Sequence, residues 1–415
     1  MSLKILKTGL IFIQLFLFST ASKLKFKPEK QKLLLVSFDG FRHDYIEMHN
    51  LKNFKRLHSQ GFRTKWIQDQ FVTKTFPNHW TIVTGLYEES HGIVSNKFFA
   101  PELDKEFNAF ARPAWKSWDK RFWKGEPVWK TNEQQGGKSG SFYWVGSEVP
   151  VNRPSYWERY NVSYPWNDRV DKVVNWLGEE EVNFATLYID EPDHHGHMYG
   201  PSSAEVGEVL QKCDRTLGYL IDKLPQNINL IVTSDHGMED LDKNHLILIE
   251  DFVPRTEYDR WYGEVTHAGI WANETQLSKI KNQLLELKKT TPNGEHLNIW
   301  YREEIPERFH LKNSQHVPPL LLVADEPYQV VRTTREARLK GEHGYDNRNM
   351  NMHPIFMGRG PVFKKESKKL EEPFDSVDIY PLMCHILGVN PAPNNGSLCE
   401  VSHLLKVEPN ECAFL

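Results

Sequence analysis

Acidic and imidazole side chains follow three apolar runs of strand length in this sequence. The runs cover residues 32–38, 184–189 and 229–233. Sites in open α/β sheets form beyond the carboxyl ends of the strands, so side chains from three distant segments would meet in one crevice. Carboxylate oxygens and imidazole nitrogens without thiolates suit a catalytic zinc ion that keeps an open coordination position. The candidate ligands at these strand ends are Asp39, Asp193, His197, Asp235 and His236.

The spacing of these residues is compatible with metal coordination. Asp193 and His197 stand four positions apart, so a helical turn would point both side chains the same way. Asp235 and His236 are adjacent, which works only at an irregular strand end where neighbours converge. His343 is the best candidate for a further histidine ligand, because glycines close to it allow close approach. Each residue alone also fits a turn, a helix cap or a surface position, and only the full set is specific.

A threonine at the start of a predicted helix is the candidate nucleophile. Pro77 follows Thr75 at a position that the first turn of a helix tolerates, and an apolar stretch runs on to Gly85. Backbone amides and the helix dipole favour negative charge at this end. A threonine hydroxyl is a poor nucleophile, and coordination to zinc would lower its pKa and activate it. The alternative is that Thr75 serves only as a helix N-cap.

The elements that must position these residues alternate between strands and helices. Continuous apolar runs suit strands that are covered on both faces, as in a parallel sheet. An amphipathic helix between two of the runs starts at a predicted capping box of Ser202 and Glu205 and ends at Pro225, and residues 170–177 form another helix. This order predicts an α/β fold with a central, mostly parallel sheet and helices on both faces. Residues 100–150 are irregular and rich in tryptophan, which favours a small, packed, loop-rich insertion.

The first residues predict export. Residues 1–22 combine Lys4 and Lys7, a short apolar run and small residues at a cleavage position, which is typical of a secretory signal peptide. The alternative is an uncleaved membrane anchor, for which the run is short. We therefore expect a secreted, extracellular and monomeric protein without a stable membrane anchor in this chain, and residues 406–415 as a C-terminal tail.

Composition and modification motifs agree with an exported small-molecule enzyme. The formal net charge is −4 and no long run of Lys or Arg occurs, so we expect no binding to nucleic-acid polymers. Cys213 and Cys384 lie in apolar segments and are expected to be buried thiols. Cys399 and Cys412 lie in a polar tail and are expected to form a disulfide. Glycosylation sequons stand at Asn161, Asn273 and Asn395.

Five ordered blocks resemble the nucleotide pyrophosphatase/phosphodiesterase (NPP) family of the alkaline phosphatase superfamily. They are SFDGFR at 37–42, TKTFPNHWTIVTGLYEESHGIVSN at 73–96, EPDHHGHMYGP at 191–201, SDHGM at 234–238 and HGYDN at 343–347. The resemblance is strongest to the short members, the fourth and fifth vertebrate types. It implies an alkaline-phosphatase-like fold and makes residues 31–405 the catalytic domain. The chain departs from those members in lacking their C-terminal membrane helix and a mid-chain cysteine pair.

The resemblance also implies roles for particular residues. It implies two Zn²⁺ ions per chain, one held by Asp39, Thr75, Asp235 and His236 and the other by Asp193, His197 and His343. Asn96 matches the family asparagine that supports the phosphate beside Thr75. Phe76 and Tyr156 match aromatic positions that sandwich a nucleobase, and Tyr328 matches an aromatic near the site.

The activity that the resemblance implies is hydrolysis of nucleotides in two displacements. Thr75 would attack phosphorus to form a covalent threonyl-nucleotide, and water would release a nucleoside 5′-monophosphate. Dinucleoside polyphosphates and nucleoside triphosphates are the expected substrates. A choline-lipid phosphodiesterase is the first alternative, although relatives of that kind alter the KTFPNH block that is intact here at 74–79. A catalytically silent binding ectodomain is an alternative from another class.

Overall fold

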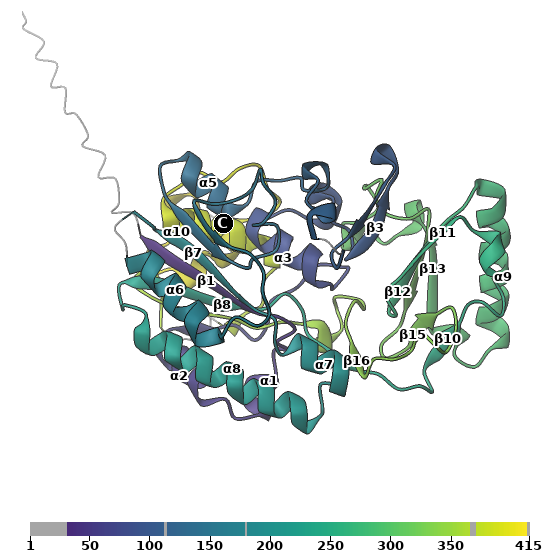
Figure 1. The fold of residues 1–415 in the computed structure, drawn as a ribbon, viewed down its shortest axis with the longest axis horizontal. Helices are drawn as coiled ribbons and strands as arrows, with labels where there is room; N and C mark the ends of the chain where they lie inside the picture. The colour runs from purple at the N-terminus through teal and green to yellow at the C-terminus, as the bar shows by residue number, and fades with distance from the viewer. Residues whose placement is uncertain (1–30, 112–113, 179–180, 366–370, 413–415) are drawn as a thin grey trace, which may run out of the picture.

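A seven-stranded sheet forms the centre of the protein (Figure 1), whose computed structural model describes residues 31–111, 114–178, 181–365 and 371–412. The five strands from β8 to β6 run parallel, and β17 runs antiparallel to both of its neighbours. The expected mostly parallel sheet is therefore confirmed. From edge to edge the strands are β2 (Phe62–Arg63), β17 (Phe356–Arg359), β8 (Ile228–Thr233), β1 (Lys32–Phe38), β7 (Phe184–Ile189), β5 (Ser139–Phe142) and β6 (Tyr156–Glu158).

The three apolar runs of the sequence are confirmed as β1, β7 and β8. They lie side by side, with Val36 opposite Leu187 on one side and Val232 on the other. Every residue of β8 is buried, because helices cover both faces of the sheet. This two-sided burial explains why the runs are continuously apolar and do not alternate. The parallel register brings the carboxyl ends of the three strands to one edge of the sheet.

Helices pack on both faces of the sheet (Figure 1). Leu34 and Val36 of β1 point into one of these two cores, and Leu33 and Leu35 point into the other. The alternation of side chains along a strand thus supplies both cores from the same residues. One face carries α2 (Lys52–Gln60), α6 (Trp166–Gly178) and α8 (Ala204–Lys223), and the other carries α3 (Thr75–Thr84), α5 (Val128–Gln134) and α10 (Ile379–Leu387).

Helix α8 confirms the predicted amphipathic helix but begins at a different cap. The Oγ of Ser203 accepts a hydrogen bond from the Val206 N–H at 3.2 Å. The predicted cap residue, Ser202, instead donates its hydroxyl to Asp240. The two serines are adjacent, and the contact with a distant aspartate decides between them. The shorter helices are α1 (Tyr45–Met48), α4 (Glu88–His91), α7 (Asp193–Tyr199) and α11 (Leu398–Val401).

The tryptophan-rich segment is a packed insertion, as expected. The hairpin of β3 (Lys97–Ala100) and β4 (Lys105–Asn108) leads into this segment, short 3₁₀ turns follow, and the end of the segment supplies α5 and β5 of the main fold. Trp123 and Trp129 are buried, and both rings contact the ring of Trp80 in α3. The tryptophans therefore serve the core behind the nucleophile helix.

Residues 241–340 form an outer lobe that the sequence interpretation did not anticipate, drawn at the right of Figure 1. Helix α9 (Glu274–Thr290) covers one face of the four-stranded antiparallel sheet in this lobe. The rest of the described chain is called the sheet lobe. The other face of the outer sheet contributes Leu321 and Val323 to the core of the sheet lobe. The antiparallel ribbon of β9 (Glu239–Asp240) and β16 (Gly341–Glu342) joins the two lobes. The outer strands are β11 (Arg260–Gly263), β12 (His267–Trp271), β14 (Leu320–Ala324) and β13 (Leu297–Tyr301), with a separate pair β10 (Leu246–Leu248) and β15 (Gln329–Val331).

The predicted covalent features fall at suitable places. Cys399 and Cys412 form a disulfide, and Cys213 and Cys384 are buried free thiols. The three sequon asparagines are exposed, although their glycosylation stays a prediction. The predicted signal segment lies outside the described residues. Among the residues that the structure describes, no helix combines the length and apolar character that a bilayer crossing needs.

Candidate active site

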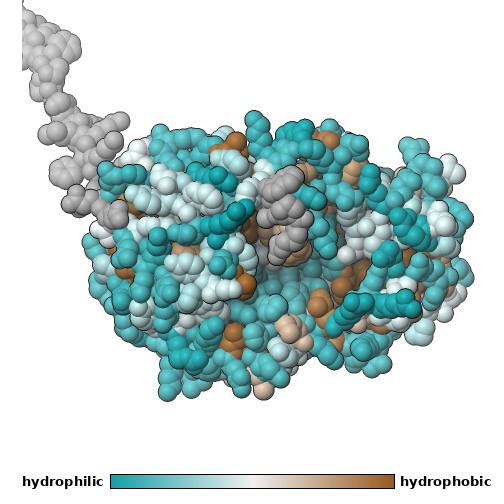
Figure 2. All heavy atoms as spheres, in the orientation of Figure 1, coloured by the Kyte–Doolittle hydropathy of each residue, from teal (hydrophilic) through white to brown (hydrophobic). Residues whose placement is uncertain are grey.

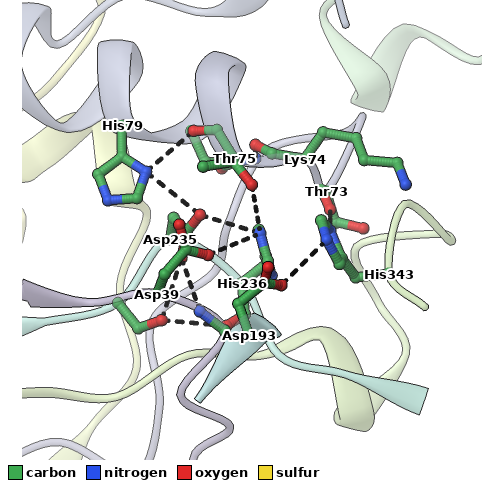
Figure 3. A network of polar contacts seen from close by, with 12 residues as sticks. Asp39, Thr73, Lys74, Thr75, His79, Asp193, Asp235, His236 and His343 are labelled. Carbon is green, nitrogen blue, oxygen red and sulfur yellow. Dashed lines mark hydrogen bonds and ion pairs between the residues drawn. The ribbon is translucent and has the colours of Figure 1, made fainter. Parts of the chain in front are cut away.

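Asp39, Asp235 and His236 converge at the carboxyl ends of β1 and β8 and form the first ligand group (Figure 3). The Nε2 atom of His236 lies 2.9 Å from Asp235 Oδ2 and 3.5 Å from Asp39 Oδ1. Thr75 Oγ1 lies 3.2 Å from the same Nε2 atom. All three ligand side chains are buried. The geometry therefore gathers one imidazole nitrogen, two carboxylates and the candidate nucleophile around a single point.

Asp193, His197 and His343 form the second ligand group. Asp193 and His197 lie on α7, one turn apart, as the spacing predicted. The Nε2 atoms of His197 and His343 each lie 3.3 Å from Asp193 Oδ1, and 3.2 Å from one another. His343 follows β16, so its position depends on the ribbon that joins the lobes. The structure thus assembles both predicted ligand sets, from segments far apart in sequence.

Each histidine of the two groups has its ring fixed by a backbone carbonyl. The Nδ1 atom of His236 donates to Gly237 O at 2.9 Å, that of His197 to Gly341 O at 3.0 Å, and that of His343 to Thr73 O at 2.7 Å. A carbonyl oxygen only accepts, so Nδ1 carries a proton and Nε2 is the nitrogen turned toward the carboxylates. Metal-binding histidines show this arrangement.

Three carboxylate oxygens of the site are buried without any hydrogen-bond partner in the described structure. They are Asp39 Oδ1, Asp193 Oδ1 and Asp235 Oδ2. The remaining oxygens of the first group are satisfied, since Tyr188 donates its hydroxyl to Asp39 Oδ2 and the Gly40 N–H donates to Asp235 Oδ1. Buried anionic oxygens without partners are costly unless a cation binds them. Each orphaned oxygen faces a histidine nitrogen, so the residues fit two metal ions.

The electrostatics of the site also favour bound cations. Burial, with Asp235 and Asp193 nearby, raises the pKa of Asp39 well above its usual value. Burial alone would lower the pKa of His197, but Asp193 and Glu342 raise it to about 9. Burial and the neighbouring His236 lower the pKa of His343 to about 4. The site concentrates negative charge in a dry environment, which a divalent ion would neutralise.

Thr75 is the first residue of α3, and its hydroxyl is not a cap. The N-cap position is Lys74, which makes no side-chain capping bond, while Thr75 Oγ1 faces His236. Asn96 lies beside it, because its Oδ1 accepts a hydrogen bond from the Phe76 N–H at 3.0 Å. The structure therefore brings Asn96 to the N-terminus of the nucleophile helix.

His79 is a site residue that the sequence interpretation missed. Its Nδ1 atom lies 2.9 Å from Thr75 O and 3.2 Å from Asp235 Oδ2, and its Nε2 atom lies 2.9 Å from Ser37 Oγ. The ring is fully buried. It braces the nucleophile helix against the first ligand group. The available signal was its position one helical turn after Thr75, which puts both residues on the same face.

Of the two aromatic residues expected to sandwich a nucleobase, Phe76 follows the nucleophile in α3, whereas Tyr156 lies away from the ligand groups. Phe76 lies in an aromatic cluster with Phe107, Phe110 and Trp123. Tyr156 starts β6 opposite Gly140, toward the amino end of the sheet, and packs on Trp176 behind it. The parallel sheet therefore carries Tyr156 away from the edge that holds the ligands.

Tyr160 occupies the place that Tyr156 was expected to fill. It follows the carboxyl end of β6, its ring is 46% exposed, and it lies 6.4 Å from the ring of Tyr188. Tyr188 in turn bonds Asp39. Both tyrosines lie within one short segment, and only the register of β6 shows which one reaches the site.

Tyr328 does not join the ligand groups. It stacks on His296 at 3.8 Å and contacts His245, both in the outer lobe. Its neighbours Pro327 and Gln329 line a cavity of about 680 Å³, and none of the residues lining that cavity is a predicted ligand. Figure 2 shows a separate hollow between the two lobes, with apolar residues along its edges.

Comparison with known proteins decides the family. A family model described as type I phosphodiesterase / nucleotide pyrophosphatase matches residues 33–346. The chain belongs to this family. The human ectonucleotide pyrophosphatase/phosphodiesterase family member 5 is 37% identical over 414 residues, which cover 98% of this chain and 84% of the relative. The human bis(5′-adenosyl)-triphosphatase ENPP4 is 38% identical over 388 residues, covering 90% and 82%.

Solved structures of this family share the fold. Murine ectonucleotide pyrophosphatase/phosphodiesterase 5, an inactive threonine-to-alanine variant in complex with AMP, matches with a TM-score of 0.85 at 37% identity, covering 91% of this chain and all of that one. The human protein of the same type matches with a TM-score of 0.84 at 36% identity. These matches confirm the predicted family and fold, and they make this phosphodiesterase an enzyme of a metal-dependent family.

Proposed function

We propose that this phosphodiesterase hydrolyses dinucleoside polyphosphates and nucleoside triphosphates to nucleoside 5′-monophosphates, with Thr75 as the nucleophile. The observation that carries the proposal is the placement of Thr75 Oγ1 3.2 Å from His236, among the orphaned carboxylate oxygens. The name of the relative that cleaves bis(5′-adenosyl) triphosphate and the AMP complex of the murine structure support a nucleotide substrate.

Two Zn²⁺ ions are the proposed cofactors. Asp39, Asp235, His236 and Thr75 would hold one ion, and the second ligand group would hold the other. Oxygen and imidazole ligands without thiolate suit catalytic zinc. When bound, the ions lower the pKa of the threonine hydroxyl and of water and neutralise charge on the phosphate.

The residues of the chain give the first displacement its direction. Thr75 Oγ forms a bond to phosphorus, the bond from phosphorus to the leaving oxygen breaks, and the hydroxyl proton passes to solvent. The N-terminus of α3 presents backbone N–H groups toward the charge that develops on the phosphoryl oxygens. Asn96 is fixed by its bond to the Phe76 N–H, so its amide can donate to the same oxygens.

The second displacement returns the enzyme to its starting state. A water oxygen bonds to phosphorus, the bond from phosphorus to Thr75 Oγ breaks, and a proton from that water passes through solvent to Thr75. The second ligand group lies beside the first, since the ring of His343 stacks on that of His236 at 3.4 Å, so water would have a polar approach there. The product is a nucleoside 5′-monophosphate, with inversion at phosphorus in each of the two steps.

Phe76 and Tyr160 are the proposed nucleobase contacts. Phe76 follows the nucleophile, and Tyr160 is an exposed ring beside the Tyr188 that holds Asp39. Aromatic rings stack on any base, which explains how one site would accept several nucleotides. Base preference would then depend on contacts at the base edge.

We also propose that the protein is secreted. The support is the signal-like segment 1–22, the three exposed sequon asparagines and the disulfide between Cys399 and Cys412. Mass spectrometry of protein recovered from the culture medium of expressing cells would show the processed N-terminus and any glycans.

A paired substrate assay tests the proposed activity. The purified protein is offered a p-nitrophenyl nucleotide ester and p-nitrophenyl phosphorylcholine, beside Thr75→Ala and Thr75→Ser variants. We expect preference for the nucleotide ester and less than about a tenth of the rate in Thr75→Ala, with the serine variant retaining more because it keeps a hydroxyl. Preference for the choline ester would overturn the substrate assignment. A Thr75→Ala variant with near-normal turnover would overturn the covalent mechanism.

A further inference from the structure

Thr73, two residues before the nucleophile, contacts the ring of the ligand His343 and the backbone that follows it. The carbonyl oxygen of Thr73 accepts from His343 Nδ1 at 2.7 Å (Figure 3). Its hydroxyl accepts from the Gly344 N–H at 2.8 Å and donates to Tyr345 O at 3.2 Å. Thr73 is fully buried. One residue thus fixes both the imidazole and the backbone that carries it.

Resting on the proposed two-metal function, we propose that Thr73 is a positioning residue whose hydroxyl sets the metal affinity of the second ligand group. The carbonyl bond fixes the His343 ring, so Nε2 faces Asp193 and His197. The hydrogen bonds of the hydroxyl fix the backbone just after His343. They therefore help to set the position of the His343 Cα atom, from which the ring projects. Groups that orient a metal ligand in this way tune its affinity.

The neighbouring residue strengthens the same connection. Lys74 Nζ lies 2.9 Å from Glu342 Oε1, and that oxygen also accepts from the His343 N–H at 3.0 Å. Both side chains are at most 5% exposed. Gly341 O fixes the ring of His197 at 3.0 Å. The segment that starts with β16, residues 341–345, therefore carries His343 and fixes the ring of His197. Thr73 and Lys74, just before the nucleophile, hold this segment in place.

Gly344, whose N–H bonds the Thr73 hydroxyl, is tightly enclosed by its neighbours. Its φ of +113° is a backbone conformation that other residues rarely adopt, and a Cβ at this position would lie 2.4 Å from Thr266 Oγ1 and 2.6 Å from Lys74 Cε. Its N–H is buried and bonds Thr73 Oγ1. Removal of the hydroxyl would leave this donor unsatisfied and displace the segment, because a buried N–H without a partner is costly.

The effect should be confined to one ligand group. The ring of His236 in the first group is fixed by its own neighbour, Gly237 O, at 2.9 Å. Asp39 is held by Tyr188 and Asp235 by the Gly40 N–H. The first group is therefore held by residues at the ends of the central strands, whereas the second depends on Thr73, which is 270 positions from His343 in sequence.

The test compares Thr73→Val with Thr73→Ser on zinc-loaded, full-length protein. Valine keeps the shape and the backbone carbonyl but removes the hydroxyl, whereas serine keeps the hydroxyl. Competition with a graded series of chelators measures the affinity of each of the two Zn²⁺ ions. We expect Thr73→Val to weaken one ion about 10- to 100-fold and to leave the other unchanged. We expect Thr73→Ser to stay within about threefold of the parent for both ions.

A double-variant cycle assigns the weakened ion. In a His343→Ala background, adding Thr73→Val should produce no further loss, because the ring that Thr73 orients is gone. If valine does not fold, Thr73→Cys replaces it, and the weak hydrogen bonding of a thiol should give an intermediate loss. Unchanged affinity for both ions, or equal loss of both, would overturn the role of Thr73. A parent protein that fails to bind two Zn²⁺ ions would instead overturn the proposed function.

Discussion

The two ligand groups are similar in composition but are held by different parts of the molecule. The side chains of Asp39, Asp235 and His236 are at most 2% exposed and follow the central strands. The side chains of Asp193 and His197 are 17% and 22% exposed, and His343 directly follows the ribbon that joins the sheet lobe to the outer lobe. A close-packed sheet fixes the first group, whereas a helix turn and a long-range contact fix the second. The site therefore combines a buried, rigid ligand group beside the nucleophile with a second group that is more accessible to solvent.

The largest expected effect comes from removing a histidine of each group in turn. His236→Ala should lower kcat by about a thousandfold, because His236 contacts Thr75 Oγ1 directly. His197→Ala should lower kcat by about a hundredfold. Rapid-quench measurement should show that the threonyl-nucleotide no longer forms in His236→Ala but accumulates in His197→Ala. Equal loss of adduct formation in both variants would show that the two ligand groups do not act in separate steps of the reaction.

Metal removal should follow the same order. The more exposed second group should release its ion first, so chelation should proceed in two phases, with most activity lost in the faster one. Atomic emission analysis of samples taken along the time course measures this. Added Zn²⁺ should restore the activity after the first phase. A single phase that removes both ions together would contradict the difference in accessibility.

The aromatic residues provide a milder comparison. Tyr160 lies beside the Tyr188 that bonds Asp39, whereas Tyr328 lies in the outer lobe and Tyr156 lies in β6 and packs on Trp176. Tyr160→Ala and Phe76→Ala should each raise KM for a nucleotide by about tenfold, the value of one lost stacking contact. Tyr156→Ala and Tyr328→Ala are the matched controls and should leave KM nearly unchanged. A rise in KM for Tyr328→Ala alone would show that the nucleobase binds at the outer lobe and not between Phe76 and Tyr160.

The smallest expected effect concerns the scaffold of the first group at low pH. His91 is fully buried beside α3, where its Nδ1 accepts from the Ile93 N–H at 3.1 Å, and burial lowers its pKa to about 3. Because the folded protein holds this ring neutral, its stabilising contribution is present above about pH 6.5 and is lost as the pH falls toward 3. The Tm of metal-free protein should fall over this range.

A His91→Gln variant is the control for that measurement. It should have a lower Tm at pH 7, since it loses the fitted ring, but a shallower decline between pH 6.5 and pH 4. A variant with the same slope as the parent would show that other groups cause the acid sensitivity.

The sequence predicted the first ligand group more easily than its surroundings. Strand ends carry Asp39, Asp235 and His236 to one edge by a general rule of parallel sheets, so runs of apolar residues were sufficient. The turn that pairs Asp193 with His197 followed from helical spacing. These predictions use local patterns whose consequences are fixed by backbone geometry.

The misses share a dependence on distant contacts. The choice between Ser202 and Ser203 depends on Asp240, and the choice between Tyr156 and Tyr160 depends on the register of β6. The outer sheet escaped notice because α9 separates its strands in sequence and β12 pairs with β14 across a gap of many residues. His79 and Thr73 look like ordinary helix and loop residues until their partners are known.

The ribbon of β9 and β16 has a consequence for how such enzymes can diversify. The chain leaves the sheet lobe at Asp240 and re-enters it at Gly341, which lie opposite one another in the ribbon. Everything between them is a module with adjoining ends, so its loops can lengthen, shorten or be exchanged without rethreading the central strands. Changes of substrate range could therefore accumulate in the module while the catalytic threonine and its nearest ligands stay untouched.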